Sequence, residues 1–228
     1  MKDLTLIIPA KNESESLPKV LSELKNFDCK ILVSLQKDDE KTINAIKSFD
    51  IEIYTQNGKG YGNSLIEGIY NCKTNYFCIF NADGSFEVND LHKMYKLIQT
   101  KDFVYTSRYE HGGGSEDDTI ITLIGNKIFS KLGNLLFSLN ISDILYTYLM
   151  GKTECFKKLN INSNDFRFCV ELPIKMQLAG MKYKSIPSYE KKRIAGEKKV
   201  NALKDGFLIL IEIIALFFRY KIFRQKII

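Results

Sequence analysis

The sequence has few of the residues that build disulfide frameworks, zinc sites and histidine metal centres. Its five cysteines form no C-x-x-C pair and leave an odd count, so we expect the reduced thiols of a cytosolic protein. His92 and His111 have no second ligand at metal-binding spacing, and we expect both at the surface. A charged segment followed by an apolar run is missing at the N-terminus, so we expect no secretory signal peptide.

No internal repeat or low-complexity tract interrupts the 228 residues, of which 45% are apolar. This composition predicts a globular protein with one sizeable core. The net charge of +6 is uneven: residues 182–228 hold 12 Lys and Arg against 4 Asp and Glu, a net of +8, so residues 1–181 carry −2. A basic C-terminal end indicates phosphates or an anionic membrane as partners, with a plain solvated face as the alternative.

Segments with strand and helix patterns alternate along the first half of the chain. Apolar, β-branched runs predict five strands, at residues 4–9, 29–35, 51–56, 75–80 and 103–108. Helical spacing predicts the helices between them, at 14–27, 38–49, 60–72 and 89–99. After a polar, glycine-rich loop we expect helices at 119–139 and 170–180 and a strand at 182–189. The alternation with short links predicts an α/β sandwich with a mostly parallel sheet.

The ends of these strands are where a ligand is expected. In open α/β sheets, ligands bind beyond the carboxyl ends of the strands. Polar or glycine-bearing segments follow four of the predicted strands there, at residues 9–13, 57–62, 81–84 and 107–108. The glycine-rich loop at 112–114 is interpreted as a lid over the bound ligand, with a plain linker as the alternative.

One of these ends, "IFNADGSF", contains an amide and an acid two residues apart. If the chain is extended here, Asn81 and Asp83 point to the same side. Oxygen ligands suit a hard cation such as Mg²⁺ or Mn²⁺, which is often held by few protein groups together with substrate phosphates. A metal bridging a diphosphate is therefore the hypothesis, and a carboxylate that caps the next turn is the alternative.

Five motifs occur in the order seen in a known family: "IIPAKNE", "NGKGYGNSLIEGI", "NADG", "SRYEHGG" and "IPSYEKKRIAGEKKV". Together they resemble inverting glycosyltransferases of family 2 type, most of all the dolichyl- and polyprenyl-phosphate mannosyl or glucosyl transferases. The resemblance runs from about residue 3 to residue 218. It implies a GT-A, Rossmann-like catalytic domain at 1–202, with a mostly parallel sheet flanked by helices. A C-terminal apolar and basic helix would follow at 203–228.

The resemblance also implies roles for individual residues. The implied nucleotide and substrate contacts are Pro9, Asn12, Glu13, Gly58, Lys59, Gly60, Ser107, Arg108, Glu171, Glu197 and Lys199. The implied metal ligands are Asp83 and Asn81, and the catalytic candidates are Asp83, Arg193 and Asp143. Arg suits a leaving diphosphate because its planar group can bind phosphate oxygens in pairs.

The sequence departs from the family's pattern at three points. Asn81 stands where the family has an acid, so Asp83 would be the principal metal ligand. Lys198 stands where the closing motif has Ser. After the second strand the acids appear only at Asp38 and Asp39, which leaves the base of the donor, guanine or uracil, open.

The acceptor decides whether a general base is needed. A lipid phosphate is already anionic and needs none, whereas a sugar hydroxyl needs a base within hydrogen-bond reach. Asp143 lies where the family places an acid near the acceptor. Its alternative role is that of a helix N-cap.

The apolar stretch at residues 207–218 is short for a membrane span. Twelve helical residues reach about 18 Å, against a hydrocarbon core of about 30 Å. With the basic residues that follow it, the stretch predicts association in the plane of a membrane. Packing on the sheet or in a homo-oligomer interface is the alternative.

The leading hypothesis is a metal-dependent glycosyltransferase that moves a sugar from a GDP- or UDP-linked donor to polyprenyl phosphate. It would work at the cytosolic face of the membrane and would need no nucleic acid. The alternative acceptor is a saccharide or lipid-linked oligosaccharide in cell-surface polysaccharide synthesis. Remoter alternatives are a sugar-phosphate nucleotidyltransferase and a non-catalytic sugar-nucleotide-binding protein.

Overall fold

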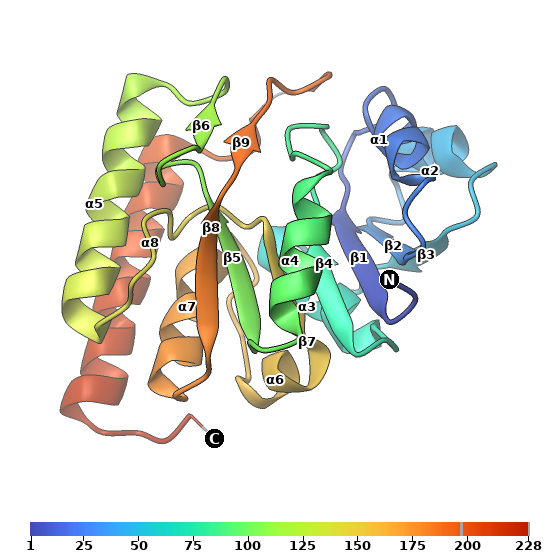
Figure 1. Ribbon diagram of the computed structural model, residues 1–228. Helices are drawn as coiled ribbons and strands as arrows, with labels where there is room; N and C mark the ends of the chain where they lie inside the picture. Colours follow the sequence, from blue (N-terminus) through green and yellow to red (C-terminus); the bar gives the residue numbers. More distant parts are fainter. Residues whose placement is uncertain (197, 228) are drawn as a thin grey trace.

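The computed structural model describes residues 1–196 and 198–227. Its main sheet has seven strands in the order β3-β2-β1-β4-β7-β5-β8 (Figure 1). The strand bounds are β1 Leu4–Pro9, β2 Lys30–Leu35, β3 Glu52–Thr55, β4 Tyr76–Ile79, β5 Phe103–Ser107, β7 Leu149–Lys152 and β8 Tyr183–Pro187. Only β7 runs antiparallel to its neighbours, β4 and β5. The predicted α/β class with a mostly parallel sheet is therefore confirmed.

Helices cover both faces of the sheet, because strand side chains alternate between two cores. On β1, Leu6 and Ile8 face one apolar cluster and Ile7 faces the other. The first cluster is closed by α1 Leu17–Leu24, α2 Glu40–Ile46 and α4 Asp90–Ile98. The second is closed by α3 Tyr61–Asn71, α6 Thr153–Lys158 and α7 Phe168–Leu178, with α5 Ile120–Phe137 and α8 Ala202–Phe217 packed beyond α7.

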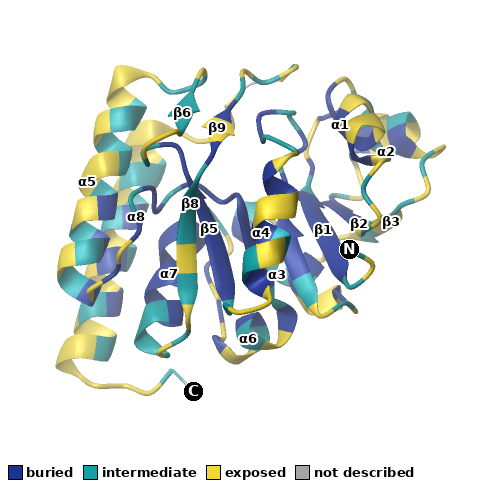
Figure 2. Cartoon of the chain, viewed as in Figure 1, coloured by how far each residue is buried: buried dark blue, intermediate teal, exposed yellow. Residues whose placement is uncertain are grey.

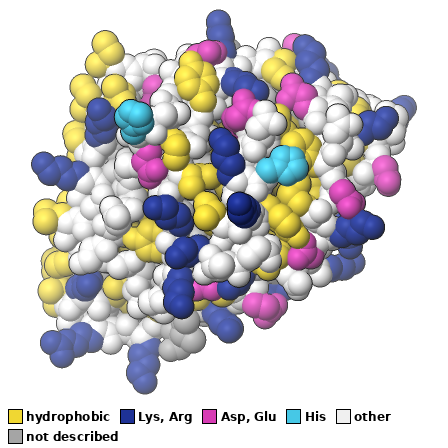
Figure 3. Space-filling model, viewed as in Figure 1, with side chains coloured by type: hydrophobic (Ala, Val, Ile, Leu, Met, Phe, Trp, Pro, Cys, Tyr) yellow, Lys and Arg dark blue, Asp and Glu magenta, His cyan; other side chains and the backbone are white. Residues whose placement is uncertain are grey.

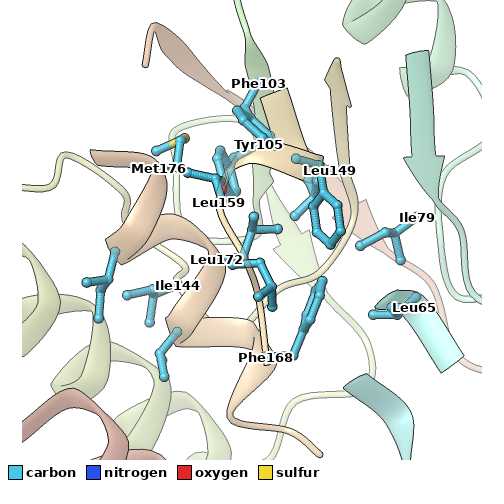
Figure 4. Packing of buried hydrophobic residues seen from close by; sticks show 14 of the residues in the cluster. Leu65, Ile79, Phe103, Tyr105, Ile144, Leu149, Leu159, Phe168, Leu172 and Met176 are labelled. Atoms are coloured by element: carbon cyan, nitrogen blue, oxygen red, sulfur yellow. The ribbon is translucent and has the colours of Figure 1, made fainter. Parts of the chain in front are cut away.

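Helix α7 lies between the sheet and the outer helices, and this position explains its composition. Phe168, Leu172 and Met176 pack toward Tyr105 and Leu149 of the sheet (Figure 4). Residues 168–176 are all buried, including Glu171 and Lys175, which form an ion pair, as expected for a helix covered on every side. The helix forms despite Pro173, as predicted.

Three short strands and one helix were not expected from the sequence. Strand β7 contains Gly151, and a Cβ there would lie 2.7 Å from ring carbons of both Phe77 and Phe103. The strand therefore depends on packing between β4 and β5 that no local pattern reveals. Helix α6 follows it directly, and β6 Gly114–Ser115 pairs with β9 Tyr189–Glu190 in a separate two-stranded sheet.

The outer helices α5 and α8 expose much of their apolar surface (Figure 2). On α8, Ile209, Ile213 and Leu216 are buried, whereas Leu203 and Phe207 are 87% and 63% exposed. A π-helical turn, η1 Phe218–Ile222, extends α8. Among the residues described, only α5 is long and apolar enough to cross a membrane by length and composition. Helix α8 contributes to the second core. The domain boundary at residue 202 stays a prediction.

The cysteine and histidine predictions can be compared directly with the structure. All five cysteines are free, and burial raises the pKa of the Cys29 thiol to about 11. His92 and His111 are both exposed, as expected.

Candidate active site

The segment after β1 turns sharply and is held by the start of α2. Asn12 adopts a left-handed conformation (φ 55°). Its N–H donates to Oδ2 of Asp39 at 2.7 Å, and the N–H of Glu13 donates to Oγ1 of Thr42 at 2.9 Å. The Glu13 carboxylate is buried and accepts a hydrogen bond from Ser16 Oγ at 2.6 Å. These contacts fix Glu13 just beyond Pro9, the last residue of β1.

Strand β4 ends at Ile79, one residue earlier than expected, and Asp83 lies in a turn. The strand-alternation argument for a common side of Asn81 and Asp83 therefore does not apply. Asp83 Oδ1 accepts the N–H of Ser85 at 3.0 Å. Its Oδ2 lies 3.7 Å from a guanidinium nitrogen of Arg193. The Asp83 carboxylate thus caps the turn that follows it, which was the alternative to metal binding. It also lies near the guanidinium of Arg193.

The segment after β9 lies along this turn. The N–H of Lys191 donates to the Ser85 carbonyl and that of Ile194 donates to the Asp83 carbonyl, both at 2.8 Å. Gly84 has φ 81°, and a Cβ there would lie 2.4 Å from the Ile194 side chain. The left-handed conformation favours glycine in "NADG", and the Ile194 side chain packs over it.

The packing of the segment after β9 on this turn brings three of its cations next to three carboxylates. Lys199 forms an ion pair with Glu13, and Arg193 reaches Asp83. Arg193 and Lys198 also bind Asp117, which the sequence analysis missed. The acid run Glu116–Asp118, which follows the three glycines, could have indicated a site residue. The glycine loop was instead interpreted only as a lid or a linker. Glu197 lies outside the described residues, so its predicted role is not tested.

Arg108 is buried and is surrounded by carboxylates. Its Nε and Nη2 bind the two oxygens of Asp143 at 2.7 and 2.9 Å, and its Nη1 binds Glu190 at 3.0 Å. Burial acts to lower the pKa of Arg108, but the hydrogen bonds and charge of Asp143 raise it well above the usual value. Ser107 Oγ is 2.7 Å from Ser142 Oγ. Ser107 and Arg108, which the resemblance implies as substrate contacts, therefore bind other protein groups here, and their contact with substrate stays a prediction.

Asp143 is fully buried, and it is neither a helix N-cap nor open to an acceptor. Both of its oxygens are engaged by Arg108. In this arrangement it positions Arg108, and a role as general base would require that ion pair to open.

We therefore expect Asp143→Asn to lower the free energy of unfolding by about 2–3 kcal/mol. Breaking a buried ion pair costs about 3–5 kcal/mol, and Arg108 keeps Glu190 as a partner. Urea unfolding measures the change, with Ser142→Ala as the control on the neighbouring residue. Equal destabilisation by the two variants would contradict the positioning role.

The predicted nucleotide loop is rigidly built. The N–H groups of Asn57 and Gly58 donate to the Glu67 carboxylate at 2.8 and 3.1 Å. Gly60 has φ 107°, and a Cβ there would lie 2.2 Å from the Asn164 carbonyl oxygen. The Asn164 carbonyl accepts the N–H of Asn63, in the first turn of α3, at 3.0 Å. Lys59 is exposed at the tip of the loop.

Glu171 holds the segment that packs against this loop. Its carboxylate accepts the N–H of Ser163 at 2.7 Å and pairs with the buried Lys175 at 2.6 Å. The structure therefore places Glu171 under residues 160–164, which pack on the start of α3. Its implied contact with substrate stays a prediction.

A groove of about 450 Å³ opens beside the same loop, at the carboxyl ends of β2 and β3. It is lined by Gln36, Lys37, Asp38, Glu40 and Gln56. Asp39 is committed to Asn12 and to the start of α2. Asp38, which is exposed, is the acid of this pair that could contact a base.

The residues fit a divalent cation only if a ligand shares its coordination. No cluster of three or more His, Cys, Asp or Glu that could hold a metal is found among the described residues. Asp83 supplies one carboxylate beside the half-buried Asn81. One carboxylate together with diphosphate oxygens is a common way of holding Mg²⁺, and the neighbouring cations suit the same diphosphate.

This fold, with acids and cations gathered at the carboxyl ends of its strands, defines an α/β enzyme of GT-A type. The chain belongs to glycosyl transferase family 2, whose sequence model matches residues 5–159. It is a glycosyltransferase, and a nucleotidyltransferase or a non-catalytic binding protein is thereby set aside.

Two curated relatives resemble almost the whole chain. An uncharacterized glycosyltransferase of Mycobacterium tuberculosis (strain ATCC 25618 / H37Rv) is 22% identical and aligns over 91% of this chain and 94% of its own. The undecaprenyl-phosphate mannosyltransferase of Micrococcus luteus is 25% identical over 88% of each chain.

Solved structures of the same fold include two phosphoglycerate glycosyltransferases. Mannosyl-3-phosphoglycerate synthase from Rubrobacter xylanophilus aligns with a TM-score of 0.73 at 15% identity, over 99% of this chain and 76% of that one. Glucosyl-3-phosphoglycerate synthase from Mycobacterium tuberculosis, in complex with Mn²⁺, UDP and phosphoglyceric acid, also gives 0.73, at 10% identity over 94% and 78%. At these identities the likeness shows the fold alone.

Proposed function

We propose that this enzyme transfers a hexose from a GDP- or UDP-linked donor to polyprenyl phosphate at the cytosolic face of a membrane. The observation that carries the proposal is the meeting of Asp83 and Glu13 with Arg193 and Lys199 at the carboxyl ends of the strands. Acids and cations together suit a diphosphate shared with a divalent metal. The nucleotide base would lie in the groove beside Gly58, and its diphosphate would face Arg193.

In the proposed reaction, a phosphate oxygen of the acceptor bonds to the anomeric carbon of the sugar. The bond from that carbon to the diphosphate breaks, and its electron pair leaves with the nucleoside diphosphate. Arg193 and Lys199 stabilise the charge that develops on the leaving oxygens. Bound Mg²⁺ or Mn²⁺, held by Asp83 with Asn81, would supply further stabilisation of that charge.

Two observations favour a phosphate as the acceptor. A phosphate oxygen needs no general base, and Asp143, the predicted base, is engaged by Arg108. The mannosyltransferase of Micrococcus luteus, by its name, acts on undecaprenyl phosphate. A saccharide acceptor remains the alternative, because its hydroxyl could be activated if that ion pair opened.

The membrane part of the proposal rests on α5 and α8. Exposed apolar residues gather along them, with Lys and Arg nearby, at the left edge of Figure 3. Leu203 and Phe207 on α8 and Ile120 and Ile121 on α5 are all more than 60% exposed. An apolar strip with neighbouring cations suits the surface of an anionic membrane.

The function is tested with UDP- and GDP-sugars, Mn²⁺ or Mg²⁺, and short polyprenyl phosphate. Sugar transfer to the lipid phosphate is expected from one donor class. Asp143→Asn should keep most of the rate per folded enzyme. Transfer to a saccharide alone, with a loss of about 10²–10⁴-fold in Asp143→Asn, would overturn the phosphate acceptor in favour of a hydroxyl.

Membrane association is tested by vesicle sedimentation. We expect the double variant Leu203→Ser/Phe207→Ser to bind vesicles containing anionic lipid about 10-fold or more weakly, because burial of each side chain contributes about 1.5–3 kcal/mol. The control is Ile53→Ser, an exposed apolar residue on β3. If the double variant instead alters the oligomeric state without changing vesicle binding, the strip is a subunit interface.

A further inference from the structure

We propose that Asp117 is an internal substitute for the donor's diphosphate, holding Arg193 and Lys198 until the donor displaces it. The inference rests on the proposed function and adds a residue that controls donor affinity and selectivity. Asp117 Oδ2 lies 2.7 Å from Nη2 of Arg193 and 3.1 Å from Nζ of Lys198. One carboxylate oxygen thus binds two cations from the segment after β9.

The position of Arg193 links Asp117 to the metal-binding acid. One guanidinium nitrogen binds Asp117 while another lies 3.7 Å from Asp83. A diphosphate that shared a cation with Asp83 would need the same face of Arg193. Asp117 therefore occupies the anion position that the donor needs, and the two cannot both hold Arg193 at full strength.

The main chain around Asp117 is anchored, so the side chain can leave alone. The N–H groups of Asp117 and Asp118 donate to Ser115 Oγ at 3.1 and 3.0 Å. Ser115 Oγ in turn donates to Glu190 Oε2 at 2.5 Å, and the same oxygen binds the buried Arg108 at 3.0 Å. Exchange for a diphosphate thus requires rotation of the Asp117 side chain and no rebuilding of the loop.

The charges of this arrangement balance one another when no donor is bound. Without donor, the carboxylates of Asp117, Asp83 and Glu13 balance the cations Arg193, Lys198 and Lys199. Burial acts to raise the pKa of Asp117, but hydrogen bonds from Arg193 and Lys198 lower it below the usual value, so the carboxylate stays charged. A singly charged anion would form no stronger ion pairs with Arg193 and Lys198 than Asp117 does. A diphosphate offers more charge and more oxygens, so the exchange favours it.

The test is the binding of UDP and GDP, measured by calorimetry in EDTA so that no metal contributes. We expect Asp117→Asn to bind the preferred nucleotide about 3- to 10-fold more tightly than wild type, since two partly exposed ion pairs of about 0.2–1 kcal/mol each no longer compete. Inorganic phosphate should also compete with the nucleotide more strongly in the variant than in wild type. Glu116→Gln removes a charge from the same loop without touching these cations, and it should change neither result.

The sign of the effect separates this role from a structural one. If Asp117 only positions the segment after β9, Asp117→Asn will bind nucleotide equally or more weakly, which would overturn the inference while leaving the donor site intact. If wild type binds neither UDP nor GDP even when Mn²⁺ is added, the proposed function fails, and the inference fails with it. Asp117→Ser provides a second variant, and loss of the fold in both would show that Asp117 is structural.

Discussion

Replacement of Asp83 by alanine is expected to abolish sugar transfer, lowering kcat/KM by about 10³-fold or more. Stabilisation of a leaving group by a bound cation is worth several kcal/mol, and each 1.36 kcal/mol is a factor of ten in rate. Asp83 is the one acid in "NADG", and its Oδ2 faces Arg193. Nucleotide binding by the variant should no longer depend on metal. Titration of UDP or GDP with and without Mn²⁺ measures this dependence independently of activity.

Variants at two other positions sharpen this test. Asn81→Ala should keep partial activity, and Asn81→Asp should tighten metal binding by adding a charged oxygen. Asp28→Ala removes an exposed acid away from these strand ends and should behave as wild type. Near-normal turnover of Asp83→Ala with metal present would refute the site, and an unchanged metal titration of Asn81→Asp would show that Asn81 points elsewhere.

Replacement of Arg193 by alanine is expected to lower kcat by about 10²–10³-fold and to change the donor KM much less. Loss of one group that stabilises developing charge typically costs this much, and the charge on the leaving diphosphate is greatest in the transition state. In the free enzyme the hydrogen bond to Asp117 raises the pKa of Arg193, so the guanidinium is always charged. Steady-state kinetics with the preferred donor gives both constants.

Lys192 provides the matched control, because it is the exposed cation next to Arg193 in the same segment. Lys192→Ala should leave both constants within about twofold, and Arg193→Lys should recover part of kcat, since it keeps the charge without the planar group. A raised KM with normal kcat in Arg193→Ala would place Arg193 in ground-state binding instead.

The fold class could be predicted because it depends on local patterns. Apolar runs such as Leu4–Pro9 and the helical spacing of Leu17, Val20 and Leu21 appear in the structure within a few residues of the predicted bounds. Strand β7 was missed because Gly151 carries no strand signal and pairs only once β4 and β5 are in place.

The sequence by itself determined the family, the order of the motifs and the acid, glycine and cation residues at the strand ends. Only the tertiary structure decided which of these groups meet. It bound Asp143 to Arg108, so neither stands free as base or phosphate ligand. It also brought Asp117 to Arg193, 76 residues away in the chain. Sequence patterns report the neighbours of a residue along one element, whereas a buried ion pair between distant segments depends on how the elements pack.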